Sequence, residues 1–418
     1  MALIPSTQPG AHRPRGRRRS AFLGATAALA MVAVAACGSN GGGSASPTAS
    51  PTNGGETTTS APGGQTFNIG LLAAETGPLA GAGSAFLSGA LIGEKLVNEE
   101  GIIGNGNTLK LNLEEASEDP ARSATVAAQF AANPENLGII CCILSPVAGA
   151  VSAVSIREEI PTVLYGATQP GLENPPYISR TTTMPQFANQ TLGREISAEI
   201  GLSTVAYVVM TDNQGIVSQA ESFKEGFAEA GVEDLGTVEI VSQQTNFASA
   251  ATSAIDLGAE AIVVVATQAE AVGMVAALYD RNYEGQIIGS ETLVGPGVFD
   301  SNPDALADVP FPVYFLPSEV NAAGQRFVDA YEAEYGSAPD SFSAQGFNAV
   351  WITAVALAGA GAEPTRESLR DAFNALTEVP DTIYGTVSFE NGQMFANQSV
   401  KIVSYSKPDG VIVPWTAP

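Results

Sequence analysis

Ser145 is the residue around which a binding site is most readily built. It follows a continuous apolar run, residues 139–144, and precedes Pro146 and a segment rich in alanine and valine. This order is typical of a buried parallel strand that passes through a short turn into a helix. The start of a helix presents unpaired N–H groups and partial positive charge, which favour an anion. In open α/β sheets, ligands bind at such strand ends. The alternative is that Ser145 only caps the helix.

The histidine content restricts the chemistry further. The one histidine of the sequence, His12, lies in a segment that we expect to be removed on export. Ser–His and Cys–His catalytic pairs are then excluded. A secreted hydrolase with Ser145 as nucleophile is also disfavoured because no Gly-x-Ser-x-Gly elbow surrounds this serine. The turn at Gly81-Ala82-Gly83 lacks the third glycine of a dinucleotide-binding motif. The sequence therefore predicts no enzyme, no metal site and no cofactor.

Cys141 and Cys142 are adjacent within the apolar run. Two buried thiols are the favoured interpretation, since a free cysteine packs as a small apolar side chain. A vicinal disulfide is the alternative, because the compartment outside the cytoplasm is oxidising. Two cysteines alone do not supply the four ligands of a structural zinc site.

The N-terminal segment has the features of an export signal. Five arginines precede an uncharged apolar run, residues 21–36, that ends in small residues. Val34-Ala35-Ala36-Cys37 resembles the bacterial lipobox, in which the cysteine carries the lipid. We expect residues 1–36 to be a lipoprotein signal peptide and Cys37 to be the lipid attachment point, on the outer face of the cytoplasmic membrane. An ordinary signal peptide is the alternative, and Arg18-Arg19 leaves the choice between Sec and twin-arginine export open.

Residues 37–65 consist almost entirely of glycine, serine, threonine, proline and alanine. Such a segment is expected to be a flexible tether with a reach of roughly 30 Å. Loss of residues 1–36 removes five of the 18 basic residues and no acidic one, so the net charge becomes 13 − 43 = −30. A chain this acidic is expected to bind no nucleic acid and to reach a membrane only through its lipid.

Strands and helices alternate along two stretches of the remaining chain. In the first stretch, Ser84 is expected to cap a helix, and Asp119-Pro120 is expected to start the next one. Regular βαβ alternation predicts parallel sheets with helices on both faces. The fold class is therefore α/β, with two doubly wound parallel-sheet lobes joined by hinge strands. Lobe 1 is expected to comprise residues 66–184 plus 317–386, and lobe 2 residues 185–316 plus 387–418.

The sequence resembles the type I periplasmic binding proteins, in the leucine/isoleucine/valine-binding branch, which are receptors of ABC importers. The resemblance covers residues 66–414. It is carried by short motifs in a fixed order: Ile69-Gly-Leu-Leu, Thr76-Gly-Pro-Leu-Ala, Asn98-Glu-Glu-Gly-Ile-Ile-Gly104, Glu118-Asp-Pro-Ala121, Ile160-Pro-Thr-Val, Tyr165-Gly-Ala-Thr, Arg180-Thr-Thr and Tyr331-Glu-Ala-Glu-Tyr-Gly.

The resemblance also implies a set of ligand-binding residues. Hydroxyls and backbone N–H groups of one lobe would hold a carboxylate without a cation, and a buried acid of the other lobe would pair with a ligand ammonium. A further aromatic residue would face the cleft or simply pack in the core. At three positions where tyrosines are usual in the family, the sequence has small or amide side chains, so the predicted pocket is less aromatic. The expected residues are Ser145, Gly166 and Thr168 for the carboxylate, Glu291 for the ammonium, Phe342 as the aromatic, and Ala82, Gln214 and Gln268 at the three substituted positions.

The implied function is a monomeric, non-enzymatic solute receptor. It would close its two lobes around an amino acid or a related carboxylate or amide, and deliver it to a membrane permease and its ATPase. A sensor that signals to a membrane partner is the alternative, which the sequence does not separate from import. The sequence does not identify the ligand.

Overall fold

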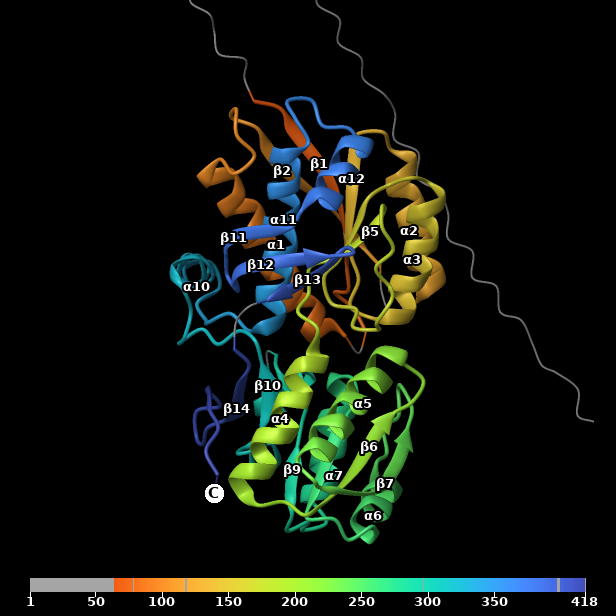
Figure 1. Ribbon diagram of the computed structural model, residues 1–418, viewed down its shortest axis with the longest axis vertical. Helices are drawn as coiled ribbons and strands as arrows, with labels where there is room; N and C mark the ends of the chain where they lie inside the picture. The colour runs from red at the N-terminus through yellow and green to blue at the C-terminus, as the bar shows by residue number, and fades with distance from the viewer. Residues whose placement is uncertain (1–63, 78, 117–118, 296, 397–398, 418) are drawn as a thin grey trace, which may run out of the picture. The chain divides into compact units, whose positions relative to one another are not determined.

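The computed structural model describes residues 64–77, 79–116, 119–295, 297–396 and 399–417. The predicted signal peptide, the lipid attachment at Cys37 and nearly all of the predicted tether lie outside the described residues. The described part belongs to one compact unit and contains two lobes, each with its own sheet (Figure 1). None of the described helices is long and apolar enough to cross a bilayer.

Lobe 1 is built on an eight-stranded sheet in the order β11-β12-β13-β5-β4-β3-β1-β2. The strands from β5 to β2 are parallel, and β11, β12 and β13 add an antiparallel edge. The inner parallel strands β1, β3 and β4 are largely apolar and buried because helices cover both of their faces, whereas the edge strand β2 alternates apolar and polar residues. The strands are β1 Thr66–Ala73, β2 Thr108–Glu115, β3 Asn136–Cys141, β4 Thr162–Leu164, β5 Ile178–Arg180, β11 Glu378–Thr382, β12 Gly385–Glu390 and β13 Gln393–Ala396.

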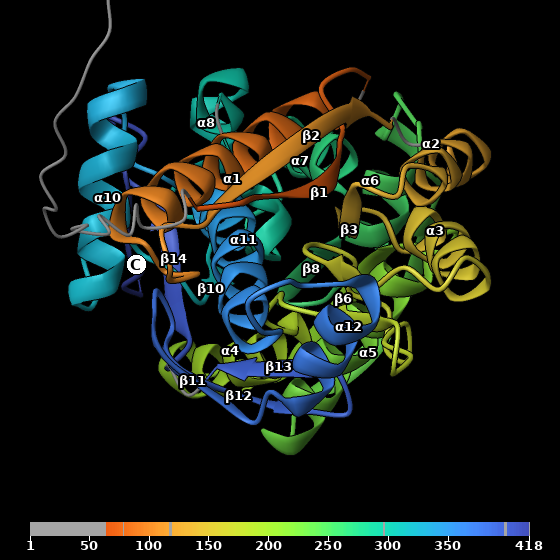
Figure 2. The same ribbon diagram turned by 90° about the horizontal axis from the view of Figure 1, so that it is seen from above.

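Helices α2 and α3 cover one face of this sheet, and α1 and α11 cover the other (Figure 2). Helix α2 begins as predicted, because the Asp119 carboxylate accepts hydrogen bonds from the N–H groups of Ala121 and Arg122. The helices are α1 Ala80–Glu100, α2 Pro120–Ala132, α3 Ser145–Arg157, α10 Ala322–Tyr335, α11 Ser341–Gly359 and α12 Arg366–Ala375.

The predicted cap at Ser84 is wrong, since α1 begins at Ala80 and Ser84 lies inside it. The glycines before Ser84 indicated a turn, but their role is close packing. A Cβ atom at Gly83 would lie 1.7 Å from the carbonyl oxygen of Ala74. The helix therefore approaches the end of β1 at a distance that only glycine permits.

Lobe 2 has a four-stranded parallel sheet in the order β7-β6-β8-β9 and a three-stranded antiparallel sheet, β10-β14-β15. Helices α4 and α5 pack together, and so do α6 and α7. The strands are β6 Thr204–Met210, β7 Glu233–Ile240, β8 Ala261–Val265, β9 Gln286–Ile288, β10 Phe311–Val313, β14 Lys401–Tyr405 and β15 Ile412–Pro414. The helices are α4 Pro185–Ile200, α5 Gln214–Glu229, α6 Ala248–Asp256, α7 Gln268–Tyr279, the 3₁₀ turn η1 Glu291–Leu293, α8 Val298–Ser301 and α9 Pro303–Leu306.

The predicted α/β fold with two parallel-sheet lobes is confirmed, but one boundary differs from the prediction. The chain passes between the lobes after β5, after β10 and after β13. Residues 387–396, which we expected in lobe 2, remain in the lobe 1 sheet, where β12 and β13 form a hairpin. Asn391 and Gly392 have φ values of 50° and 80° at its turn, as an Asn-Gly hairpin requires. That dipeptide is the sequence signal for the later boundary.

Candidate functional site

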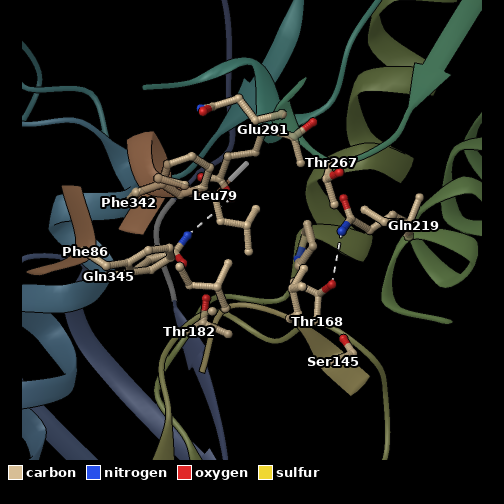
Figure 3. A pocket seen from close by; sticks show the side chains of 18 of the residues that line it. Leu79, Phe86, Ser145, Thr168, Thr182, Gln219, Thr267, Glu291, Phe342 and Gln345 are labelled. Carbon is tan, nitrogen blue, oxygen red and sulfur yellow. Dashed lines mark hydrogen bonds between the residues drawn. The ribbon is translucent and has the colours of Figure 1, made fainter. Parts of the chain in front are cut away.

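A cavity lies between the two lobes and encloses about 660 Å³, including its open mouth (Figure 3). Lobe 1 lines it with residues that follow β1, β3, β4 and β5. Lobe 2 lines it with residues that follow β6, β8 and β9. The carboxyl ends of the parallel strands of both sheets thus meet at one place, which is where open α/β sheets bind ligands.

Ser145 and Thr168 provide two hydroxyls on the lobe 1 side. Ser145 is buried and is the first residue of α3, and its Oγ accepts a hydrogen bond from the Gln169 N–H at 3.1 Å. The Thr168 Oγ1 accepts one from the Gln219 Nε2 at 3.1 Å. Each hydroxyl oxygen is an acceptor in these bonds, so its own proton is available to donate to a ligand. The pair suits an anion with exposed oxygens, such as a carboxylate. Since α3 has no side-chain cap bond, the alternative role of Ser145 as a helix cap is not observed.

The loop that carries Thr168 is fixed from behind. The Arg180 Nη2 donates to the Gln169 carbonyl at 2.7 Å and to the Glu173 carboxylate at 2.6 Å. Burial lowers the pKa of Arg180, and the Glu173 charge opposes that change. At Gly166, a Cβ atom would lie 2.9 Å from the Phe86 ring. The loop therefore has little freedom to move away from Ser145.

Glu291 lies on the opposite side of the cavity from these hydroxyls (Figure 3). The Gln345 Nε2 donates to its carboxylate at 3.4 Å. Burial raises the pKa of Glu291 to about 7, the Ser341 hydrogen bond partly offsets that rise, and the Asp340 charge adds to it. No ion pair among the described residues includes Glu291. Because the pKa in the fold exceeds the ordinary 4.5, this group costs the ligand-free fold stability as the pH rises from about 4.5 to about 7.

Aromatic rings form a third side of the cavity. The rings of Phe86 and Phe342 stack with centroids 5.2 Å apart, and Phe86 also meets Tyr165 at 4.6 Å. Phe342 lines the cavity and packs against the hydrophobic cores of both lobes. Both roles considered for it from the sequence are therefore present. Leu79 and Ile216 add further apolar surface to the cavity.

The structure brings all but one of the expected site residues together around the cavity. The residues that line it are Ser145, Gly166, Thr168, Glu291, Gln268, Ala82 and Phe342.

Gln214 does not line the cavity, contrary to our expectation, and its side chain is exposed. Helix α5 begins at this residue, and Asn213 caps it by accepting the Gly215 N–H at 2.9 Å. The helical period then places Asn213, Ile216 and Gln219 on the face toward the cavity and Gln214 on another face.

Several lining residues escaped the sequence analysis, among them Gln219, Thr267 and Gln345. Thr267 immediately precedes α7, so it holds in lobe 2 the kind of position that indicated Ser145 in lobe 1. Gln345 is a buried amide within α11, a helix whose first five turns are almost entirely buried. A polar residue in such an apolar helix usually has a hydrogen-bond partner, and this pattern could have indicated Gln345 from the sequence.

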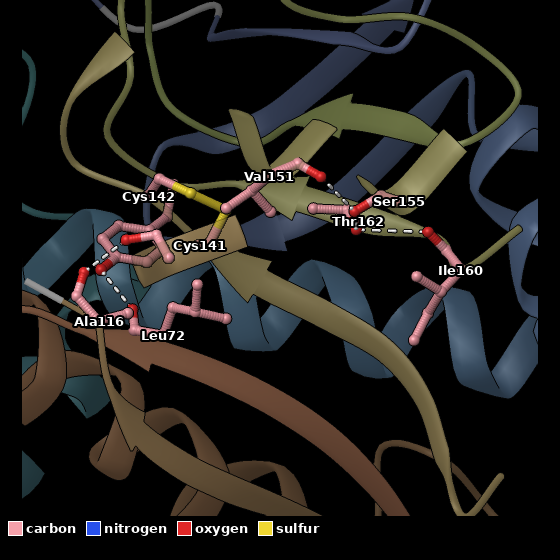
Figure 4. The surroundings of a disulfide bond; sticks show 10 residues. Leu72, Ala116, Cys141, Cys142, Val151, Ser155, Ile160 and Thr162 are labelled. Atoms are coloured by element: carbon pink, nitrogen blue, oxygen red, sulfur yellow. Dashed lines mark hydrogen bonds between the residues drawn. A yellow bond between two sulfur atoms is a disulfide. The ribbon is translucent and has the colours of Figure 1, made fainter. Parts of the chain in front are cut away.

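The favoured interpretation of Cys141 and Cys142 as free thiols is wrong, since the structure joins them in a disulfide (Figure 4). Both are buried at the end of β3 among apolar residues that include Leu72 and Val151. An apolar surrounding suits a buried thiol and a disulfide equally, so packing alone did not distinguish the two. Among the described residues, no group of three or more potential ligands is placed to hold a metal ion.

Two parallel-sheet lobes that enclose a largely apolar cavity with a few polar groups, at the carboxyl ends of their strands, define a two-lobed solute-binding protein. The chain belongs to the periplasmic binding protein family, whose model matches residues 66–409. Proteins of this family are extracytoplasmic, serve ABC permeases and bind small molecules without transforming them. The hydrolase hypothesis for Ser145 is therefore discarded.

Solved structures agree on the fold. A leucine binding protein from Thermotoga maritima superposes with a TM-score of 0.75 at 19% identity, covering 83% of this chain and 97% of its own. A branched-chain amino acid transporter substrate binding protein from Streptococcus pneumoniae, in complex with isoleucine, superposes with a TM-score of 0.74 at 21% identity. The match covers 84% of this chain and 99% of that protein. An ABC transporter solute binding protein from Rhodopseudomonas palustris, in complex with 3,4-dihydroxybenzoic acid, superposes with a TM-score of 0.73 at 20% identity. The match covers 84% of this chain and 96% of that protein. No curated protein matches the chain.

Proposed function

We propose that this protein is the receptor of an ABC importer and binds an amino acid, or a related small carboxylate or amide, between its lobes. One observation carries the proposal: the cavity has two hydroxyls with available protons on one side and, on the other, a buried carboxylate that forms no ion pair within the described part of the chain. A ligand carboxylate satisfies the first side and a ligand ammonium satisfies the second.

The ligands of the structural neighbours support the carboxylate as the shared element. Isoleucine and 3,4-dihydroxybenzoic acid both carry one, although only isoleucine carries an ammonium. In our proposal Ser145 and Thr168 donate to the carboxylate, and Gly166 lets the loop approach it. Glu291 pairs with the ammonium. The rest of the ligand lies against Ala82, Gln268 and Phe342, whose surroundings in the cavity combine amides with apolar groups.

The proposed cellular setting follows from the N-terminal sequence. Signal cleavage would leave Cys37 as a lipid-bearing first residue, and residues 37–65 would tether a monomeric receptor near the permease and its ATPase. The test is membrane fractionation of cells that produce the full chain or its Cys37→Ala variant. We expect the full chain in the membrane fraction and the variant either soluble or retained uncleaved. If the cleaved full chain is found in the soluble fraction to the same extent as the cleaved Cys37→Ala variant, lipidation at Cys37 is contradicted.

A thermal-shift screen tests the binding function. The mature chain, with Cys37→Ser in place of the lipid attachment, is unfolded and refolded to remove any bound ligand. It is then mixed with common amino acids, aromatic and aliphatic carboxylates, amides, urea and a few sugars. A ligand at 100 times its Kd adds about 2.7 kcal/mol of stability, or roughly 5–11 °C in Tm for a lobe-sized unfolding unit. A shift with a carboxylate supports the proposal, and shifts only with sugars, or with nothing in the panel, contradict it.

A further inference from the structure

Gly215 lies across the cleft from the two hydroxyls of the proposed carboxylate site. It is the second residue of α5, in lobe 2, whereas Ser145 and Thr168 belong to lobe 1. A Cβ atom at residue 215 would lie 2.5 Å from the Ser145 Oγ and 2.8 Å from the Thr168 Oγ1. Both distances are shorter than real Cβ contacts. The Gly215 backbone thus lies against both hydroxyls, with no room for a side chain between them.

The backbone of Gly215 does not explain why the residue is glycine. Its φ is not in the left-handed region, so alanine can adopt the same conformation. Alanine is also the better helix former. What excludes a side chain here is the approach of the two lobes.

The two hydroxyls are not free to move aside for a methyl group. The Ser145 Oγ is held by the Gln169 N–H, and the Thr168 Oγ1 by the Gln219 amide. Rotation of either side chain would break its hydrogen bond and turn its proton away from the ligand. A methyl group at residue 215 therefore has to be accommodated by separating the lobes.

We propose that Gly215 is a specificity-determining residue of the ligand site, an inference that rests on the proposed carboxylate-binding function. The absence of a side chain lets the first turn of α5 close onto the Ser145–Thr168 hydroxyl pair. The bound carboxylate is then enclosed between the first turns of two helices, α3 from lobe 1 and α5 from lobe 2. The positive ends of both helix dipoles favour its charge. The carboxylate itself thereby couples binding to lobe closure.

The test is calorimetric titration of the mature chain carrying Cys37→Ser. The probes are L-isoleucine, 3,4-dihydroxybenzoate and any carboxylate that the thermal-shift screen identifies. We expect Gly215→Ala to weaken the binding of each carboxylate that the unaltered site accepts at least tenfold, without lowering the Tm of the ligand-free protein. The matched control is Gly149→Ala, which changes a helical glycine of α3 with open space around it. This control should keep Kd within twofold.

A double-mutant cycle identifies the cause of the loss. In a Ser145→Ala background the closest contact of the new methyl group is gone, so Gly215→Ala should cost less than it does alone. An equal cost in both backgrounds would overturn the contact as the cause. Undiminished affinity of Gly215→Ala would overturn the role of Gly215 while leaving the receptor function intact. Failure of the unaltered site to bind any carboxylate would instead remove the proposed function, and this inference with it.

Discussion

The two polar sides of the cavity meet a ligand in different ways. On the lobe 1 side, Ser145 and Thr168 are neutral, and each already accepts a hydrogen bond from the protein. On the other side, Glu291 is a buried acid whose pKa burial raises to about 7, and no ion pair among the described residues includes it. The first side carries no charge that a ligand has to neutralise, although both hydroxyl protons remain available to donate. The second side carries an electrostatic cost that a ligand can remove.

This difference separates the two parts of ligand recognition. Hydroxyl donors recognise a carboxylate by geometry, and their protonation does not change near neutral pH. A buried carboxylate recognises a cation by charge, and its response depends on pH. In the proposed complex, the hydroxyl side selects for a carboxylate, and Glu291 selects for an ammonium on the same ligand.

The largest expected effect is that of Glu291→Gln on the binding of an amino acid. Loss of a charge-assisted hydrogen bond to the ammonium should cost about 2 kcal/mol, or roughly thirtyfold in Kd. Calorimetric titration of the variant measures it. The control is Glu260→Gln, in the same lobe but outside the cavity. If the amino acid binds the variant as well as it binds the unaltered protein, Glu291 has no ammonium partner.

The pH dependence of Kd sharpens the same point. With a pKa of about 7, Glu291 is mostly ionised at pH 8 and mostly protonated at pH 6. An ammonium ligand requires the ionised form, so its binding should weaken about tenfold from pH 8 to pH 6. A ligand without a cation should show the opposite trend, because its complex leaves the carboxyl protonated. In the Glu291→Gln variant, Kd should not change between pH 6 and pH 8 for either kind of ligand. A pH dependence that persists in this variant would assign the titration to another group.

On the neutral side, Ser145→Ala should weaken carboxylate binding about tenfold, about 1.4 kcal/mol for one hydrogen bond to a charged group. The loss should be the same at pH 6 and pH 8, unlike that of Glu291→Gln. Ser152→Ala is the control on the same helix, since its buried hydroxyl has no hydrogen-bond partner in the described structure. Equal Kd values for the two alanine variants would remove Ser145 from the site.

Strand ends could be predicted from the sequence because an apolar run that stops at a polar residue leaves a clear pattern. That pattern located Ser145, and the resemblance to the family added Thr168 and Glu291. Contacts between the lobes could not be predicted in this way. Gly215 and Gln345 meet their partners only after the chain has crossed between the lobes, and nothing local in the sequence relates residue 215 to residue 145.

The orientation of helix faces and the redox state of the cysteines also could not be predicted from the sequence. Gln214 was expected because it stands where the family usually has a tyrosine. The structure begins α5 at this residue, and because each residue turns a helix by about 100°, Asn213 and Gln219 face the cavity instead. For Cys141 and Cys142 the sequence supports the same apolar packing in either redox state. The lobe boundary was also missed, although the Asn391-Gly392 turn was visible in the sequence.

The smallest effects are expected for alanine substitutions of Gln219 and Gln214. Comparing the two tests which face of α5 meets the cavity. Gln219→Ala removes the donor to the Thr168 Oγ1 and should weaken carboxylate binding about fivefold, about 1 kcal/mol for one neutral hydrogen bond. Gln214→Ala, on the exposed side of the same helix, should change Kd less than twofold. Both values come from the same titrations as those of Ser145→Ala. If Gln214→Ala proves the more damaging, the ligand-bound form must turn α5 relative to lobe 1. The neutral side of the cavity would then be completed only on closure, and its contrast with the Glu291 side would be lost.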